Sequence, residues 1–114
     1  AHAAVQIRAI RIEPARPRLG TAVTVSFELV NDTRRTQAVL ADLRVHFVKA
    51  AGHAAPKVFK LKTMQLAPGV PAQVRKRISL ANLSTRRHYP GSHVVEAQLN
   101  GEVRALGSFT LVAR

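Results

Sequence analysis

The sequence has 114 residues, no Cys, and 18 Lys and Arg against 6 Asp and Glu, which gives a formal net charge of +12. This length suits one domain with its own core, and the lack of Cys excludes disulfides and thiolate metal sites. No apolar run approaches the roughly 20 residues of a membrane-spanning helix, so no membrane partner is expected. The start, AHAAVQIRAI, lacks the apolar segment of a secretion signal and lacks Met, so we expect a piece of a longer protein.

Acidic and basic residues are segregated along the chain. All 6 acids lie toward the two ends, and none occurs between Leu43 and Val95. That interval contains Arg44, Lys49, Lys57, Lys60, Lys62, Arg75, Lys76, Arg77, Arg86 and Arg87. A soluble domain this basic usually binds a polyanion, most often nucleic acid. A merely solvated basic surface is the alternative.

Alternation of apolar and polar residues, the pattern of half-buried β-strands, dominates the first half of the chain. The first predicted strand runs from about Val5 to Ile12 and changes phase near Ala9, which indicates a bulge or a strand switch. The second, TVSFELVND, is ended by Asn31 and Asp32, and a third follows in LRVHFVK. The inward positions of these two strands are Val23, Val25, Phe27, Leu29, Leu43, Val45 and Phe47.

Three further segments continue the alternation. VFKLKTMQL directs Phe59 and Leu61 inward, and VRKRISL places Lys76 on its apolar face, so this lysine is expected at a sheet edge or with its ammonium group reaching solvent. In HVVEAQLNGEVRALGSFTLV, Asn100-Gly101 is the signature of a type I′ hairpin turn. One face of this hairpin is expected to hold Val95, Ala97, Leu99, Val103, Ala105, Phe109 and Leu111.

Turn signals separate these segments at regular intervals. About seven short strands at this spacing predict an all-β fold, an antiparallel β-sandwich of immunoglobulin or fibronectin III kind, over residues 1–114 as a single domain. A small closed barrel is the alternative. We expect the aromatic rings of Phe27, Phe47, Phe59 and Phe109 between the two sheets.

Residue constellations typical of enzymes are scarce. Ser84 and Ser92 lie near His88 and His93, but no acid in the region could orient a histidine for nucleophilic catalysis. The two histidines lack a third partner for a metal ion. The sequence therefore predicts no catalytic residue, no metal and no cofactor in this chain.

Two strands carry basic residues suited to binding. PKVFKLK places Lys60 and Lys62 on one strand face with Lys57 near the strand start. VRKRI places Arg75 and Arg77 on one face of the next strand. Together they predict a basic stripe for phosphates spaced along a nucleic-acid backbone.

The loop STRRHYPG is the most distinctive candidate. Guanidinium groups match phosphate oxygens in a fork, and Ser and Thr hydroxyls add short hydrogen bonds. Tyr89 has an alternative role, packing on the core as a tyrosine corner. Arg86, Arg87 and His88 are expected outside. The candidate DNA-binding residues of this loop are Ser84, Thr85, Arg86, Arg87, His88 and Tyr89.

The stretch HFVKAAGHAAPKVFKLKTMQLAPGVPAQVRKRISLANLSTRRHYPGSHVVEAQLNG resembles a known family. It is similar to the C-terminal Ig-like domain of AlkC-type bacterial DNA alkylation repair proteins, DNA glycosylases whose catalytic part is built of HEAT-like repeats. The resemblance runs from about Leu19 to Leu111, and its most specific pieces are HFVKA, PKVFK, LAPG, STRRHYPG and NG. The family often has TRRYYPG, so His88 is the departure.

The resemblance implies a bacterial cytoplasmic protein that excises alkylated bases from DNA. The base-excising carboxylate would lie in an upstream HEAT-like-repeat domain, and this chain, expected to be monomeric, would be the accessory module that contacts duplex DNA. An Ig-like domain for adhesion or for another protein or polyanion, with no role in repair, is the alternative that the residues leave open.

Overall fold

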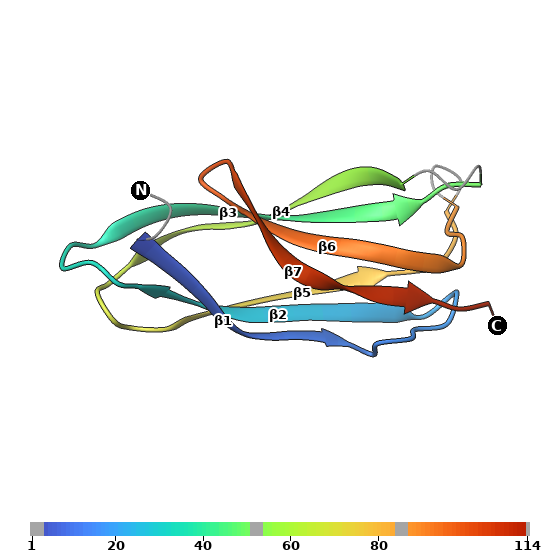
Figure 1. Cartoon of the computed structure of the whole chain (residues 1–114), viewed down its shortest axis with the longest axis horizontal. Helices are drawn as coiled ribbons and strands as arrows, with labels where there is room; N and C mark the ends of the chain where they lie inside the picture. The colour runs from blue at the N-terminus through green and yellow to red at the C-terminus, as the bar shows by residue number, and fades with distance from the viewer. Residues whose placement is uncertain (1–3, 51–53, 84–86, 114) are drawn as a thin grey trace.

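The chain forms two antiparallel β-sheets that face each other (Figure 1). The structure is a computed structural model that describes residues 4–50, 54–83 and 87–113. One sheet has three strands in the order β1-β2-β5, and the other has four in the order β4-β3-β6-β7. The strands are β1 (Val5–Glu13), β2 (Ala22–Asn31), β3 (Gln37–Val48), β4 (Ala54–Leu66), β5 (Ala72–Ser79), β6 (Gly91–Leu99) and β7 (Glu102–Leu111). The predicted sandwich is confirmed.

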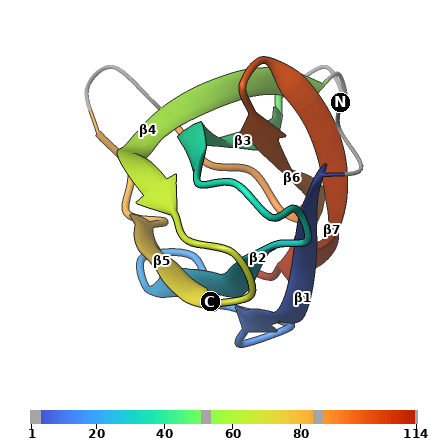
Figure 2. The same cartoon turned by 90° about the vertical axis from the view of Figure 1, so that its left-hand side faces the viewer.

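The core lies between the two layers, which Figure 2 shows end-on. The central strands β2 and β3 alternate buried and half-buried residues, as the sequence pattern predicts. Phe27, Phe47 and Phe109 are buried there. Phe59 is only half-buried, because β4 is an edge strand and its ring closes the side of the core rather than its centre. The core cluster joins residues of both sheets, so we expect the 114 residues to fold as an isolated domain.

The phase change in β1 is a bulge. Ala9 has a φ of 55°, and the register with β2 shifts between Arg8 and Arg11. The prediction made from the sequence is confirmed. The bulge matters for the surface, because after it Arg11 and Glu13 lie opposite Ser26 and Thr24 on the outer face of the three-stranded sheet.

The β6–β7 hairpin confirms one expectation and corrects another. Asn100 and Gly101 have φ angles of 50° and 84°, which is the type I′ turn. Val103 and Ala105 do not share the buried face with Phe109, however, and Val103 is 44% exposed. The register shifts by one residue next to Gly107, whose φ is 149°, and a single extra residue turns every later side chain to the other face.

A buried asparagine ends β2. Asn31 is fully buried, and its Nδ2 donates to the carbonyl oxygens of Arg35 and Leu66 at 2.6 and 2.8 Å. Its Oδ1 accepts from the backbone N–H and the hydroxyl of Thr33 at 2.8 and 2.7 Å. The side chain thus ties the β2–β3 turn to the end of β4, at the end of the sandwich away from the C-terminus.

Among the described residues there is no helix whose length and apolar character would let it traverse a bilayer.

We predict that Asn31→Leu lowers the free energy of unfolding by about 2–4 kcal/mol, because it leaves buried backbone groups without hydrogen-bond partners. Urea unfolding of the isolated chain measures this. The exposed neighbour is the control: Asp32→Ala should change stability by no more than about 0.5 kcal/mol. Equal effects of the two substitutions would contradict the role given to Asn31.

Candidate nucleic-acid interface

The loop between β5 and β6 lies at the C-terminal end of the sandwich, beside the β1–β2 loop (Figure 1). The backbone N–H of Gly20 donates to the carbonyl of Leu80 at 3.0 Å, and that of Leu80 donates to the carbonyl of Thr21 at 2.8 Å. We call residues 14–21, 80–83 and 87–90 together the basic tip. The tip holds exposed Arg16 and Arg18 as well as Arg87. Arg16 and Arg18 are not among the residues expected from the sequence, because only the fold brings the two loops together.

The base of the β5–β6 loop is anchored in the core. Leu80 is fully buried, and the Oδ1 of Asn82 accepts the backbone N–H of His88 at 2.7 Å, which closes the loop. His88 is only 5% exposed, and its ring lies 5.2 Å from that of Phe47. The expectation that His88 lies outside is therefore wrong. The physical reason is its contact with the Phe47 ring, which packs the imidazole against the core.

A second buried histidine stands under the same loop. His93 is fully buried, stacks on Phe109 with ring centroids 4.9 Å apart, and meets Phe47 edge-on at 5.7 Å. Its Nδ1–H donates to the carbonyl oxygen of Gly91 at 3.0 Å, while its Nε2 is buried and has no hydrogen-bond partner among the described residues. Burial lowers the pKa of His93 below its usual value, and the Gly91 carbonyl opposes this only in part. The alternation of His93 with Val95 was the sequence signal for this core position.

The structure places only part of the predicted loop site. Ser84, Thr85 and Arg86 lie outside the described residues, and Arg87 is exposed. Tyr89 is half-buried, and within the described part of the chain its hydroxyl makes no hydrogen bond, so the bond of a tyrosine corner is not formed there. The loop thus presents a guanidinium group and leaves the polar end of Tyr89 uncommitted.

The basic residues of β5 lie as the sequence predicts. Arg75 and Arg77 are exposed on the outer face of the three-stranded sheet. Lys76 points inward at the sheet edge, with its ammonium nitrogen 5.8 Å from the centre of the Phe59 ring, where Lys57 lies 5.7 Å away. β4 and β5 belong to different sheets, and they meet along one open side of the sandwich (Figure 2).

The lysines of β4 do not form the predicted single face. The register with β3 shifts by one residue, so Lys60 lies opposite outward-facing Asp42 and Lys62 opposite inward-facing Ala41. The extra residue is Leu61, which packs against the core. Both lysines are exposed, but the bulge separates their directions and breaks the stripe.

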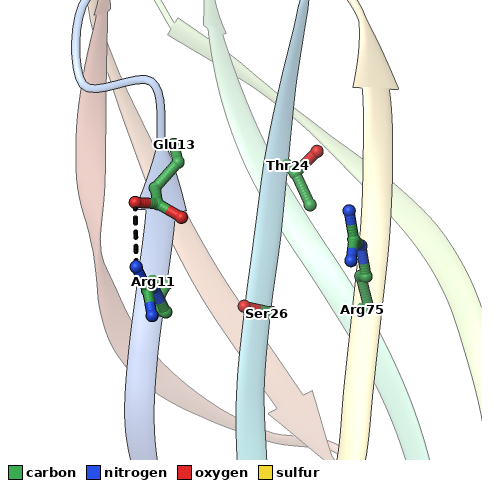
Figure 3. A pocket seen from close by; sticks show the side chains of 5 residues that line it. All are labelled: Arg11, Glu13, Thr24, Ser26 and Arg75. Carbon is green, nitrogen blue, oxygen red and sulfur yellow. Dashed lines mark hydrogen bonds and ion pairs between the residues drawn. The ribbon is translucent and has the colours of Figure 1, made fainter.

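A shallow hollow lies on the outer face of the three-stranded sheet. Its lining residues come from all three strands, and its volume is about 400 Å³. Figure 3 shows Thr24 and Ser26 of β2 between Arg11 and Glu13 of β1 on one side and Arg75 of β5 on the other. Arg11 Nη2 donates to Glu13 Oε2 at 3.2 Å. Small side chains in the middle strand and long ones at both sides make this face concave.

On the outer face of the four-stranded sheet, Arg44, His46 and Glu96 form a charged cluster. Glu96 Oε1 lies 2.6 Å from His46 Nε2 and 3.4 Å from Arg44 Nε. The hydrogen bond from His46, helped by Arg44, lowers the pKa of Glu96 although partial desolvation raises it. Within the described ranges, no group of three or more His, Asp or Glu could hold a metal ion.

Comparison with known proteins agrees with this architecture. Residues 6–113 match the family model described as the C-terminal Ig-like domain of the uncharacterised protein YhaZ. The chain belongs to this family of Ig-like domains. It is 31% identical over 100 residues to protein YhaZ of Bacillus subtilis (strain 168), an alignment that covers 88% of this chain and 28% of YhaZ.

Solved structures extend the comparison. The alkylpurine DNA glycosylase AlkC of Pseudomonas fluorescens, bound to DNA containing an abasic site analog, matches with a TM-score of 0.90 and 38% identity, over 96% of this chain and 31% of AlkC. A β-glucosidase of Listeria innocua matches with a TM-score of 0.75 but 14% identity, over 94% of this chain and 16% of the enzyme, so it shares the fold alone. The chain spans less than a third of YhaZ and of AlkC.

We predict that folding stability falls as the pH drops below about 6.5, the value of an unfolded histidine. Because His93 has a lowered pKa when folded, the unfolded chain binds the proton first, and the stability present above this pH is lost below it. The loss is at most about 1.4 kcal/mol per pH unit. Urea unfolding between pH 7.5 and 5.5 measures it.

The control for this prediction is His93→Phe, which keeps an aromatic ring beside Phe109 but cannot titrate. The variant should lose less stability than the parent chain over the same pH range. Equal losses in both proteins would assign the pH dependence to other groups.

Proposed function

We propose that this chain is the accessory DNA-binding module of a DNA alkylation repair glycosylase. The likeness to part of AlkC, at 38% identity over nearly the whole chain, carries this proposal, because that protein is a DNA glycosylase seen with DNA. The net charge of +12 and the basic tip fit a polyanionic partner.

The proposed contacts lie at the tip and beside it. Backbone phosphates would be bound by loop residues Ser84, Thr85, Arg86, Arg87 and Tyr89, and by Arg75, Arg77, Lys57, Lys60 and Lys62 on the strands. His88 would support the loop from within rather than contact DNA, because its ring is buried against Phe47.

The proposal extends to the whole protein. We infer that this domain is the C-terminal part of a longer, monomeric bacterial protein of the cytoplasm, with a HEAT-like-repeat catalytic domain upstream. That domain would supply the residue that excises the alkylated base. The chain itself would add DNA affinity and orient the DNA through the positive charge of its tip, without a catalytic residue or cofactor of its own.

We predict that Arg86→Ala/Arg87→Ala lowers the affinity of the full-length protein for duplex DNA and slows base excision. Each lost phosphate contact should reduce the slope of log K against log salt by about 0.9. Stability should change by no more than about 0.5 kcal/mol, because exposed side chains contribute little to folding. Salt titrations of DNA binding and single-turnover excision assays measure the two effects.

The chain offers a matched control at the opposite end of the sandwich. Arg34 and Arg35 are likewise neighbours in the sequence; both are exposed, and their loop lies between β2 and β3. Arg34→Ala/Arg35→Ala removes the same charge and should leave DNA binding nearly unchanged. If both double variants weaken binding equally, only net charge matters and the role of the tip is refuted.

A further inference from the structure

The outer face of the three-stranded sheet is organised in cross-strand rows. Register places Arg11 and Arg75 on either side of Ser26, and Glu13 and Arg77 on either side of Thr24. The strands that carry the two arginines of the first row are separated by β2, and their backbones are therefore roughly 9–10 Å apart. The two β2 residues have short side chains with hydroxyl groups, so the floor of the hollow is polar.

The charges on this face are unevenly compensated. Arg8 is paired with Glu28 at 3.1 Å, and Glu28 also accepts a hydrogen bond from Gln73 at 2.6 Å. Arg11 is paired with Glu13 at 3.2 Å. Arg75 makes no ion pair or hydrogen bond with any described residue through its guanidinium group, although it lines the hollow. The guanidinium group of Arg75, unpaired among the described residues, therefore lies beside the hydroxyl groups of Ser26 and Thr24.

We propose that this hollow is a binding site for a phosphate group. Arg75 would donate a forked pair of hydrogen bonds to two phosphate oxygens, with the Ser26 and Thr24 hydroxyls donating from below. Arg11 would contribute its remaining donors from the other side while Glu13 holds its orientation. A guanidinium beside short hydroxyls matches an anion with several oxygens better than it matches a carboxylate.

The source of the phosphate is a phosphodiester of duplex DNA, and this assignment rests on the proposed function. The hollow is open along the sheet rather than enclosed, which suits a group carried by a long polymer. It is also continuous with the basic tip: beyond Arg75, β5 continues through Arg77 to Ser79, and Leu80 begins the loop. One DNA strand bound at the tip would pass this face within about five residues of β5, roughly 17 Å.

The first experiment uses inorganic phosphate and the isolated chain, so that it does not depend on DNA or on the rest of the protein. Amide resonances of Thr24, Ser26 and Arg75 should shift during an NMR titration, and Arg75→Ala should weaken binding at least fivefold. Sulfate at equal ionic strength tests for a general anion effect. Shifts spread evenly over all basic residues, or unchanged by Arg75→Ala, would overturn the site.

Glu13 provides a test in the opposite direction. Because its carboxylate occupies Arg11 and repels an anion, Glu13→Gln should raise phosphate affinity several-fold. Asp32→Asn makes the same change of net charge at the far end of the sandwich and should have little effect. Equal gains in the two variants, or no gain from Glu13→Gln, would contradict the proposed geometry.

The second experiment tests the source of the phosphate with duplex DNA and the full-length protein. Arg75→Ala should reduce the slope of log K against log salt by about 0.9, the value for one phosphate contact. Arg8→Ala/Glu28→Gln removes a neutral ion pair from the same face and should leave the slope unchanged. Equally tight binding of a sulfated polysaccharide, with the same dependence on Arg75, would overturn the assignment to DNA.

The two proposals fail separately. If phosphate binds at Arg75 but substitution of Arg86 and Arg87 does not change DNA affinity, the phosphate site in the hollow is supported and the proposed role of the loop is refuted. If DNA binding depends on the loop but Arg75→Ala changes neither the phosphate affinity nor the salt dependence of DNA binding, the role of the loop is supported and the phosphate site in the hollow is refuted.

Discussion

The structure depends on keeping the space between the two sheets dry. Burial of the inward faces of β2, β3 and β6 removes a large set of apolar side chains from water, and hydrophobic burial of this kind is the main source of stability. Since side chains of a strand alternate between its faces, every inward Val, Leu or Phe sends its neighbours outward. Most charged residues of this very basic chain are thus carried on outer faces, edges and tips, where they remain hydrated.

The positions of the 6 acidic residues make the outer faces of the two sheets differ in how far their basic residues are paired. On the four-stranded sheet, Glu96 holds Arg44 and His46 in a compact half-buried cluster. On the three-stranded sheet, Glu28 and Glu13 hold Arg8 and Arg11, but no described acid reaches Arg75. Charge that is not neutralised by the fold is available to a ligand. We therefore expect the outer face of the three-stranded sheet to suit a polyanion better than the face around Glu96.

The basic tip is connected to the core through aromatic contacts. Phe47 touches both His88 and His93, and His93 stacks on Phe109, so the base of the β5–β6 loop continues the packing of the sandwich. A neutral imidazole is well suited to this position, since it packs as an aromatic ring and donates to a backbone carbonyl. Because burial lowers the pKa of His93, we expect acid to weaken this support of the loop.

The sequence by itself determined the features that depend on neighbouring residues. Alternation located the seven strands, Asn100-Gly101 specified the hairpin turn, the phase change near Ala9 indicated the bulge, and the position of Lys76 in its strand predicted its place at an edge. The tertiary structure decided what depends on pairing between distant segments. The one-residue shifts at Leu61 and Gly107 reversed the expected faces, because a bulge is defined by the register of two strands. Likewise, the burial of His88 depends on its contact with Phe47, which is distant in the sequence. Arg11 and Arg75 lie on either side of the β2 hydroxyl groups only because β2 pairs with both β1 and β5.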